Sequence, residues 1–170
     1  MDLKSLVRDI PDFPKKGILF RDITPLIGNA DAFEELVETM AKPLREKDID
    51  LIVGPEARGF IFGVALANAL HAGFVPARKP GKLPYKTIGY QYGLEYGTDE
   101  LQIHVDAIRP GSRVAIVDDL LATGGTALAC AKLVEKAGGV VEGCVFAIEL
   151  CDLNGRALLK DYPVETVLKY

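Results

Sequence analysis

Two adjacent carboxylates, Asp118 and Asp119, stand shortly before a turn made of two glycines between two threonines, residues 123–126. Four apolar residues, 114–117, precede the acids, and an apolar-periodic run begins at Leu128. This order predicts a buried strand, acids where the strand ends, a loop and then a helix. Unpaired backbone N–H groups at the start of that helix, together with two hydroxyls, suit a phosphate group.

A single phosphate cradle beside two acids suits a sugar phosphate, because carboxylates accept hydrogen bonds from sugar hydroxyls. Either half of the block alone would equally describe a solvated acidic loop or a glycine turn. As one ordered block it is more specific. Two common nucleotide-binding motifs are missing from the sequence: there is no Gly-x-x-x-x-Gly-Lys-Ser/Thr, and no Gly-x-Gly-x-x-Gly follows a predicted strand.

Cations gather at two further places that could meet negative charge. Arg58 follows a short apolar run at 51–53, and Arg78, Lys79 and Lys82 lie in a loop rich in glycine and proline. Solvated surface charge is the alternative at both places. The net charge is −4, however, so a local cationic cluster is informative. Ligands of open α/β sheets bind at the carboxyl ends of the strands, and the glycine-rich turn, Arg58 and the 78–82 loop are all predicted at such ends. A substrate with a monophosphate at one end and a diphosphate at the other would span these three sites.

The elements that must position these residues alternate between strand and helix. Strands are predicted at residues 51–53, 74–77, 100–105, 114–117, 140–150 and 164–168, and helices at 3–10, 31–47, 60–70, 128–137 and 154–160. Asp31 and Glu34 have the spacing of a capping box, and Pro43 should interrupt the second helix near its end. Residues 85–96 are typical of a β-arm or flap. The pattern predicts an α/β fold, a central mostly parallel sheet with helices on both faces.

Composition narrows the function classes. A chain of 170 residues fits one domain, and its acidic balance argues against a nucleic-acid partner. No apolar run reaches the length of a membrane span and no signal segment starts the chain, so we expect no membrane partner and a cytoplasmic location. Cys130 and Cys144 are interpreted as buried reduced thiols. With only two histidines, any divalent metal should arrive with the substrate's diphosphate, held by oxygens.

The central block resembles the signature of the type I phosphoribosyltransferases, which bind 5-phosphoribosyl-1-diphosphate (PRPP). Four more segments, residues 17–22, 56–60, 78–84 and 94–97, occur in the order seen in the adenine-specific members of that family. The likeness covers nearly the whole chain. It implies one type I phosphoribosyltransferase domain over residues 1–170, with N-terminal hood elements at about 1–30, a flap at about 79–105, and the core sheet at about 49–78 and 112–170.

The resemblance also assigns roles to individual residues. The 5′-phosphate would lie on Ala122, Thr123, Gly124, Gly125 and Thr126, the ribose hydroxyls on Asp118 and Asp119, the diphosphate on Arg58, Arg78, Lys79, Lys82 and Tyr96, and the base on Leu19, Phe20, Arg21 and Leu150. Phe20 and Leu150 would cover the two faces of the base, and backbone groups at Leu19 and Arg21 would read its edge. Many relatives have serine where this chain has Ala57, but contacts there are expected through the backbone.

The reaction implied by the resemblance is adenine plus PRPP giving AMP and diphosphate, with Mg²⁺ as cofactor, in a homodimer that could place Arg78 across the interface. The flap carrying Glu95 and Tyr96 would close and exclude water. Glu95 is then the candidate for handling the proton of the base, with pairing to a flap cation as the alternative. The catalytic set is Glu95, Asp118 and Asp119.

Two alternatives remain. The first is a phosphoribosyltransferase for another base (xanthine, hypoxanthine/guanine or orotate). The second, weaker alternative is a PRPP-binding regulator without catalysis; such proteins carry an added DNA-binding domain, for which this chain has neither room nor a basic patch.

Overall fold

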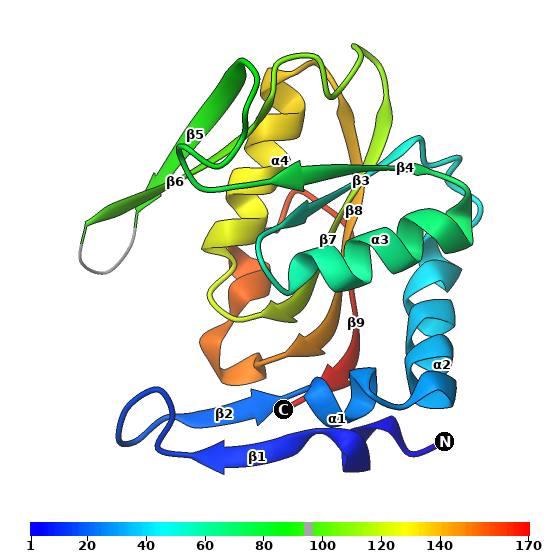
Figure 1. Ribbon diagram of the computed structural model, residues 1–170, viewed down its shortest axis with the longest axis vertical. Coiled ribbons are helices and arrows are strands. Elements are labelled where there is room, and N and C mark those ends of the chain that lie inside the picture. The colour runs from blue at the N-terminus through cyan, green and yellow to red at the C-terminus, as the bar shows by residue number, and fades with distance from the viewer. Residues whose placement is uncertain (94–96) are drawn as a thin grey trace.

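The computed structural model describes residues 1–93 and 97–170 of the chain. Its centre is a five-stranded parallel sheet in the order β4-β3-β7-β8-β9 (Figure 1). The strands are β3 (Leu51–Pro55), β4 (Gly73–Ala77), β7 (Arg113–Leu121), β8 (Val140–Glu149) and β9 (Val164–Lys169). Each of them overlaps a strand predicted from the sequence. The α/β fold class is confirmed.

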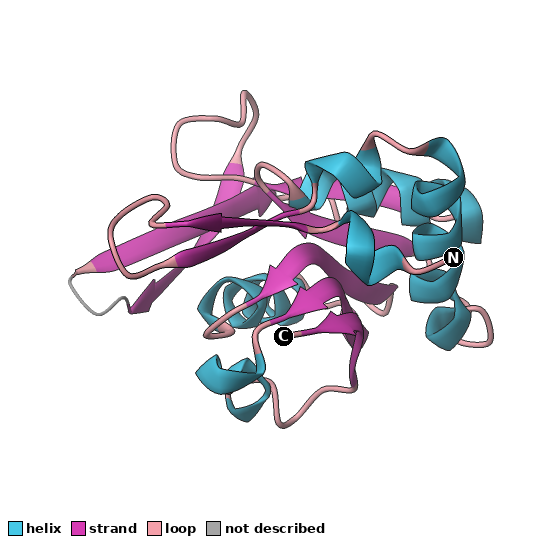
Figure 2. Cartoon of the chain, turned by 90° about the horizontal axis from the view of Figure 1, so that it is seen from below, coloured by secondary structure: helices cyan, strands magenta, loops and turns pink. Residues whose placement is uncertain are grey.

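Helices cover both faces of this sheet, as expected. The main helices are α2 (Ala30–Ala41), α3 (Gly59–Leu70) and α4 (Gly125–Lys136), with the short α1 (Thr24–Ile27) before them. One buried cluster joins α2 and α3 to alternate residues of β7, Ala115 and Val117, and the other joins α4 to Val114 and Ile116. Because successive side chains of a strand point to opposite faces, α4 lies on the opposite face from α2 and α3 (Figure 2).

Two antiparallel hairpins lie outside the central sheet (Figure 1). The first pairs β1 (Arg8–Pro11) with β2 (Leu19–Asp22), and the second pairs β5 (Thr87–Gly93) with β6 (Thr98–His104). The β5–β6 hairpin is attached to the body of the protein through α4, where Lys136 Nζ donates to the carbonyl of Gly89 at 2.9 Å. The first hairpin lies within residues 1–30, for which hood elements are predicted, and the second within residues 79–105, for which a flap is predicted.

The predicted helix at residues 3–10 is wrong. A 3₁₀ helix, η1 (Leu3–Leu6), is followed directly by β1. The pairing of Ile10 with Phe20 places this segment in a sheet. A short amphipathic stretch cannot compete with that pairing, because an isolated helix of this length is marginal in water.

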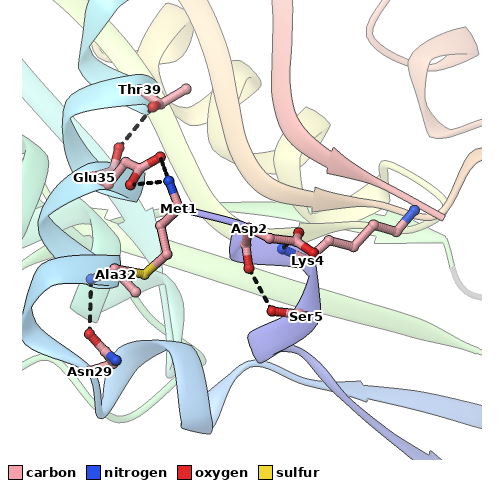
Figure 3. A network of polar contacts seen from close by, with 8 residues as sticks. All are labelled: Met1, Asp2, Lys4, Ser5, Asn29, Ala32, Glu35 and Thr39. Carbon is pink, nitrogen blue, oxygen red and sulfur yellow. Dashed lines mark hydrogen bonds and ion pairs between the residues drawn. The ribbon is translucent and has the colours of Figure 1, made fainter.

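The predicted N-cap of the second helix, Asp31, is also wrong, by two residues. The N-cap is Asn29, whose side-chain oxygen accepts from the N–H of Ala32 at 3.1 Å (Figure 3). The helix stops at Ala41, and a 3₁₀ helix, η2 (Lys42–Leu44), carries Pro43. The interruption at Pro43 is therefore confirmed, whereas the expected continuation to residue 47 is not.

The predicted helix at residues 154–160 is replaced by two 3₁₀ helices, η3 (Cys151–Leu153) and η4 (Gly155–Ala157). Between them Asn154 has a φ of +50°, a left-handed conformation that a continuous α-helix excludes.

Cys130 and Cys144 are buried free thiols, as interpreted, and burial raises the pKa of Cys144 to about 12. Over residues 1–93 and 97–170, none of the helices combines the length and the apolar character that crossing a bilayer requires.

Candidate active site

The glycine-rich turn joins the end of β7 to the start of α4. Gly124 precedes the helix with a φ of +90°, a conformation that side chains other than glycine's rarely adopt. Among the described residues, no side chain caps the first turn of α4. The N–H groups of that turn therefore remain available to a ligand, and the helix dipole favours an anion at this position.

A pocket of about 190 Å³ opens at this turn. Its lining consists of Arg58, Asp118, Asp119, Leu120, Leu121, Ala122, Thr123, Gly124, Gly125, Thr126, Ala127 and Phe146. The structure therefore brings the predicted phosphate-loop residues 122–126 together with both acids and Arg58. The pocket is smaller than those that enclose a drug-sized ligand. Its size suits one part of a substrate rather than the whole molecule.

The two acids lie within β7 rather than after it. Asp118 pairs with Phe146 of β8, and β7 continues to Leu121, which pairs with Glu149. The predicted end of this strand at residue 117 is therefore too early. Because the strand continues, Asp118 and Asp119 point to opposite faces of the sheet at its carboxyl edge.

The acids have different surroundings. A Cβ built on Gly59 would lie 2.8 Å from Asp118 Oδ1, and that same oxygen accepts the N–H of Asp119 at 2.8 Å. Desolvation by burial, and then the charge of Asp119, raise the pKa of Asp118 well above its ordinary value. Asp119 is only 8% exposed and accepts a hydrogen bond from Arg58 Nε, which raises the pKa of Arg58. Asp119 is therefore a buried carboxylate paired with Arg58.

A second pocket, of about 400 Å³, lies beside the β1–β2 hairpin. Its lining consists of Ile10, Phe13, Phe20, Arg21, Asp22, Ile23, Thr24 and Arg58. The rings of Phe13 and Phe20 meet edge to face, with centroids 5.2 Å apart. The guanidinium carbon of Arg58 is 5.7 Å from the centroid of Phe20. Arg58 lines both pockets, so they adjoin at this side chain.

The residues predicted to contact a base are only partly gathered there. In the part of the chain that the structure describes, the second pocket includes Phe20 and Arg21 but neither Leu19 nor Leu150. Leu19 is 45% exposed, and Leu150 packs against the core on the α2–α3 face. The side chain of Arg21 pairs with Asp9 and lies 4.2 Å from the centroid of the Tyr170 ring.

The cations of the 78–82 loop are paired within the chain. Arg78 Nε lies 3.2 Å from Glu56, whose Oε1 also accepts the N–H of Lys79 at 2.8 Å. Lys79 Nζ contacts Asp99 at 2.8 Å, and this pairing raises the pKa of Lys79 and lowers that of Asp99. Lys82 is exposed. The structure does not bring these three cations into the pocket at the glycine-rich turn.

Several neighbours of the site were not predicted. Tyr92 of β5 lies close to the turn, since a Cβ on Gly125 would be 3.6 Å from its ring, and its hydroxyl donates to Asp99 at 3.3 Å. Phe13 lies in a loop with two prolines and gave no periodic signal. It could have been found only by recognising the β1–β2 pairing. Glu95 and Tyr96 lie outside the described residues.

A family model for the phosphoribosyl transferase domain matches residues 26–169. The adenine phosphoribosyltransferases of Pseudothermotoga lettingae and Fervidobacterium nodosum are each 58% identical to this chain, over the full length of both partners. This chain belongs to the adenine phosphoribosyltransferase family. The family assignment rests on the full length of the chain, so it includes both hairpins as well as the central sheet.

Solved structures of this family have the same fold. The crystal structure of adenine phosphoribosyltransferase from Thermoanaerobacter pseudethanolicus matches with a TM-score of 0.96 and 56% identity, covering 99% of this chain and 98% of that one. The Saccharomyces cerevisiae enzyme, complexed with D-2,5-dideoxy-2,5-imino-altritol 1,6-bisphosphate and adenine, matches with a TM-score of 0.91 and 44% identity, covering 96% and 94%. The central sheet is therefore that of the type I phosphoribosyltransferases.

Proposed function

We propose that this chain transfers the 5-phosphoribosyl group of PRPP to adenine, forming AMP and diphosphate in purine salvage. One observation carries the proposal: a phosphate-loop pocket with two carboxylates adjoins a pocket lined by aromatic rings, and Arg58 lines both. A ribose phosphate in the first pocket would present its C1 toward a base in the second.

The first pocket is proposed to bind the phosphoribosyl group. Residues 122–126 hold the 5′-phosphate through backbone N–H groups at the start of α4. Asp118 and Asp119 accept hydrogen bonds from the ribose hydroxyls. Arg58 Nε donates to Asp119, so ribose hydroxyls that bind Asp119 would release the guanidinium toward the diphosphate. Arg58 thus exchanges one anion for another, which limits the cost of breaking its ion pair.

The second pocket is proposed to bind adenine. Phe20 stacks on one face of the ring and Leu150 covers the other once substrate is present. Backbone groups of Leu19 and Arg21 read the edge of the base, and an amide edge distinguishes a 6-amino from a 6-oxo purine. The side chain of Arg21 is engaged by Asp9 and Tyr170, which supports a backbone role for this residue.

In the proposed reaction the N9 lone pair of adenine attacks C1 of the ribose, and the bond from C1 to the diphosphate oxygen breaks with its electron pair going to diphosphate. Positive charge develops on the ribose ring in the transition state, where the carboxylates of Asp118 and Asp119 lie close by. The proton displaced from the base goes to Glu95. The flap excludes water, which would otherwise hydrolyse PRPP.

The described residues include no group of three or more metal-ligating side chains. Asp118 and Asp119 both line the phosphate-loop pocket. They fit instead a Mg²⁺ ion held mainly by the substrate, because this ion is commonly bound through one or two carboxylates plus phosphates. When bound, Mg²⁺ supplies positive charge that neutralises the departing diphosphate.

Diphosphate is proposed to contact Arg58, Arg78, Lys79, Lys82 and Tyr96. Arg78 and Lys79 must first exchange their ion pairs with Glu56 and Asp99. Both pairs are partly exposed, and such pairs are worth only about 0–1 kcal/mol, so a diphosphate can replace them.

A homodimer is proposed from the apolar surface of α3. Ile61 and Val64 lie one turn apart on this helix and are 41% and 52% exposed. A second copy covering this face would bury both, and Arg78 is near it because its guanidinium lies 5.9 Å from the ring of Phe60. Sedimentation of the chain over a range of concentrations tests the dimer, and a monomer at every concentration would contradict it.

The role of Glu95 has its own test. Glu95→Gln removes the proton acceptor and keeps the shape of the side chain, so we expect turnover to fall about 10²- to 10⁴-fold, the usual contribution of general acid–base catalysis. Glu100→Gln, five positions further along the sequence, is the matched control, because Glu100 bonds only to Gln102 among its described side-chain partners. Unchanged turnover in Glu95→Gln would remove Glu95 from the chemistry.

The function is tested by incubating the chain with PRPP and Mg²⁺ and one base at a time: adenine, hypoxanthine, guanine, xanthine or orotate. We expect diphosphate release and AMP formation with adenine, and no diphosphate release with any of the other four bases. Release with another base but not with adenine would identify a phosphoribosyltransferase of different specificity. PRPP binding without release for any base would identify a regulator.

A further inference from the structure

The segment that follows β8, residues 150–157, packs its backbone against the outside of the phosphate loop. A Cβ built on Gly155 would lie 2.4 Å from the carbonyl oxygen of Ala122 and 2.8 Å from a methyl carbon of Leu121. In return, a Cβ built on Gly124 would lie 2.6 Å from the carbonyl oxygen of Gly155. Backbone therefore meets backbone at these two glycines, and the side chain of Leu121 packs beside Gly155.

This contact requires a glycine at position 155 because there is no space for a side chain, and not because of the backbone angles of the residue. Its φ lies outside the left-handed range, unlike that of Gly124, so another residue could adopt its backbone angles. Gly155 is nevertheless buried, whereas Asn154 and Ala157 beside it are exposed. In the described part of the chain Gly155 does not line the phosphate-loop pocket, so it would not touch a bound phosphate.

Arg156 fixes this segment to the central sheet. Its guanidinium donates to both oxygens of Glu149, at 2.7 and 2.9 Å, and also to the carbonyl of Val164 at 2.9 Å. Thr166 donates to Glu149 at 2.7 Å as well. Glu149 is only 6% exposed, and its pKa is lowered first by the hydrogen bonds from Arg156. A forked pair of this kind is geometrically specific as well as strong.

The start of the segment is also attached to the strand that leads into the phosphate loop. The N–H of Leu150 donates to the carbonyl of Leu121 at 3.0 Å, and the N–H of Cys151 donates to the carbonyl of Tyr170 at 2.8 Å. The end of β7 is therefore touched twice, by Leu150 and by Gly155. The segment that contacts the loop beginning at Ala122 is therefore held near both of its ends, at Leu150 and at Arg156.

We propose that Gly155 and Arg156 are positioning residues for the 5′-phosphate. They hold the backbone at residues 122–124 in the conformation that directs its N–H groups at the phosphate. This inference rests on the proposed function, in which residues 122–126 bind the 5′-phosphate. A misplacement of about 1 Å can reduce the activity of an enzyme about 10²-fold. A methyl group at Gly155 meets rigid backbone, so the phosphate loop itself must move.

The test is Gly155→Ala, measured in the full chain. We expect its KM for PRPP and its Kd for AMP to rise at least about 10-fold, and its KM for adenine to stay within about twofold, because the base binds in the other pocket. Gly143→Ala is the matched control: a Cβ there meets the carbonyl oxygen of Pro163 at 3.5 Å, an ordinary contact. It should leave all three constants unchanged.

A second variant covers the case in which Gly155→Ala does not fold. Arg156→Lys keeps the positive charge beside Glu149 but cannot form the fork, so the KM for PRPP should again rise while that for adenine does not. Folded variants with unchanged constants for PRPP and AMP would overturn the proposal. So would equal losses for both substrates, which a merely structural role predicts. If the wild-type chain binds neither PRPP nor AMP, the proposed function fails instead.

Discussion

Replacing Phe20 by alanine tests whether the two proposed pockets bind different substrates. Phe20 is the aromatic side chain that faces both the second pocket and Arg58. Stacking of one base on an aromatic side chain is worth about 1–3 kcal/mol by alanine substitution. Each 1.4 kcal/mol is a factor of ten, so the KM for adenine should rise about 5- to 150-fold. The KM for PRPP should change less than about twofold, because Phe20 is not among the described residues that line the phosphate-loop pocket.

The assay is the initial rate of diphosphate release, with adenine varied at saturating PRPP and then PRPP varied at saturating adenine. The matched control is Phe33→Leu on α2, whose ring meets Phe62 at 5.9 Å in the core. This control also removes an aromatic pair. It should lower the unfolding temperature and leave the KM values for adenine and PRPP unchanged. The reasoning is refuted if Phe20→Ala leaves the KM for adenine within twofold of wild type, or if both KM values rise together.

Two further predictions concern buried acids. The raised pKa of Asp118 means that the folded state holds its proton more tightly, so stability falls as pH rises from the ordinary value of 3.8 through the raised one. Asp118→Asn should unfold at a higher temperature than wild type at pH 8 and show a flatter dependence on pH, with lower turnover; parallel melting curves would contradict this. Hydrogen bonds from Thr24, and then Arg8, lower the pKa of Asp22 to about 2. The resulting stabilisation is complete above 3.8 and lost as pH falls toward 2, so Asp22→Asn should be less stable at pH 6 and lose less on acid titration. An unchanged acid transition would argue against that contribution.

The central sheet and the phosphate loop were predictable because their signals are local. Continuous apolar runs identify strands buried on both faces, and the order of acids, glycines and threonines places a helix start directly after one of them. The pairing of Arg58 with Asp119 is different in kind, since 61 positions separate the two residues. Only the order of the strands, with β3 beside β7, brings them together.

The β1–β2 pairing was missed for a related reason. Nothing local marks residues 8–11 as a strand. Their conformation depends on pairing with residues 19–22, and with it comes the contact between Phe13 and Phe20 that shapes the second pocket. The true end of β7 was likewise set by a neighbour, because its register with β8 extends the strand past Asp118 and Asp119. An apolar pattern ends where the polar residues begin, even when the strand does not.

A crystal structure of the chain with AMP tests the central claim most directly, because one molecule must occupy both pockets. We predict the 5′-phosphate on the backbone of residues 122–126, the ribose hydroxyls on Asp118 and Asp119, the adenine ring on Phe20, and Arg58 no longer paired with Asp119. A phosphate bound away from the glycine-rich turn, or an adenine ring outside the pocket of Phe13 and Phe20, would contradict the account.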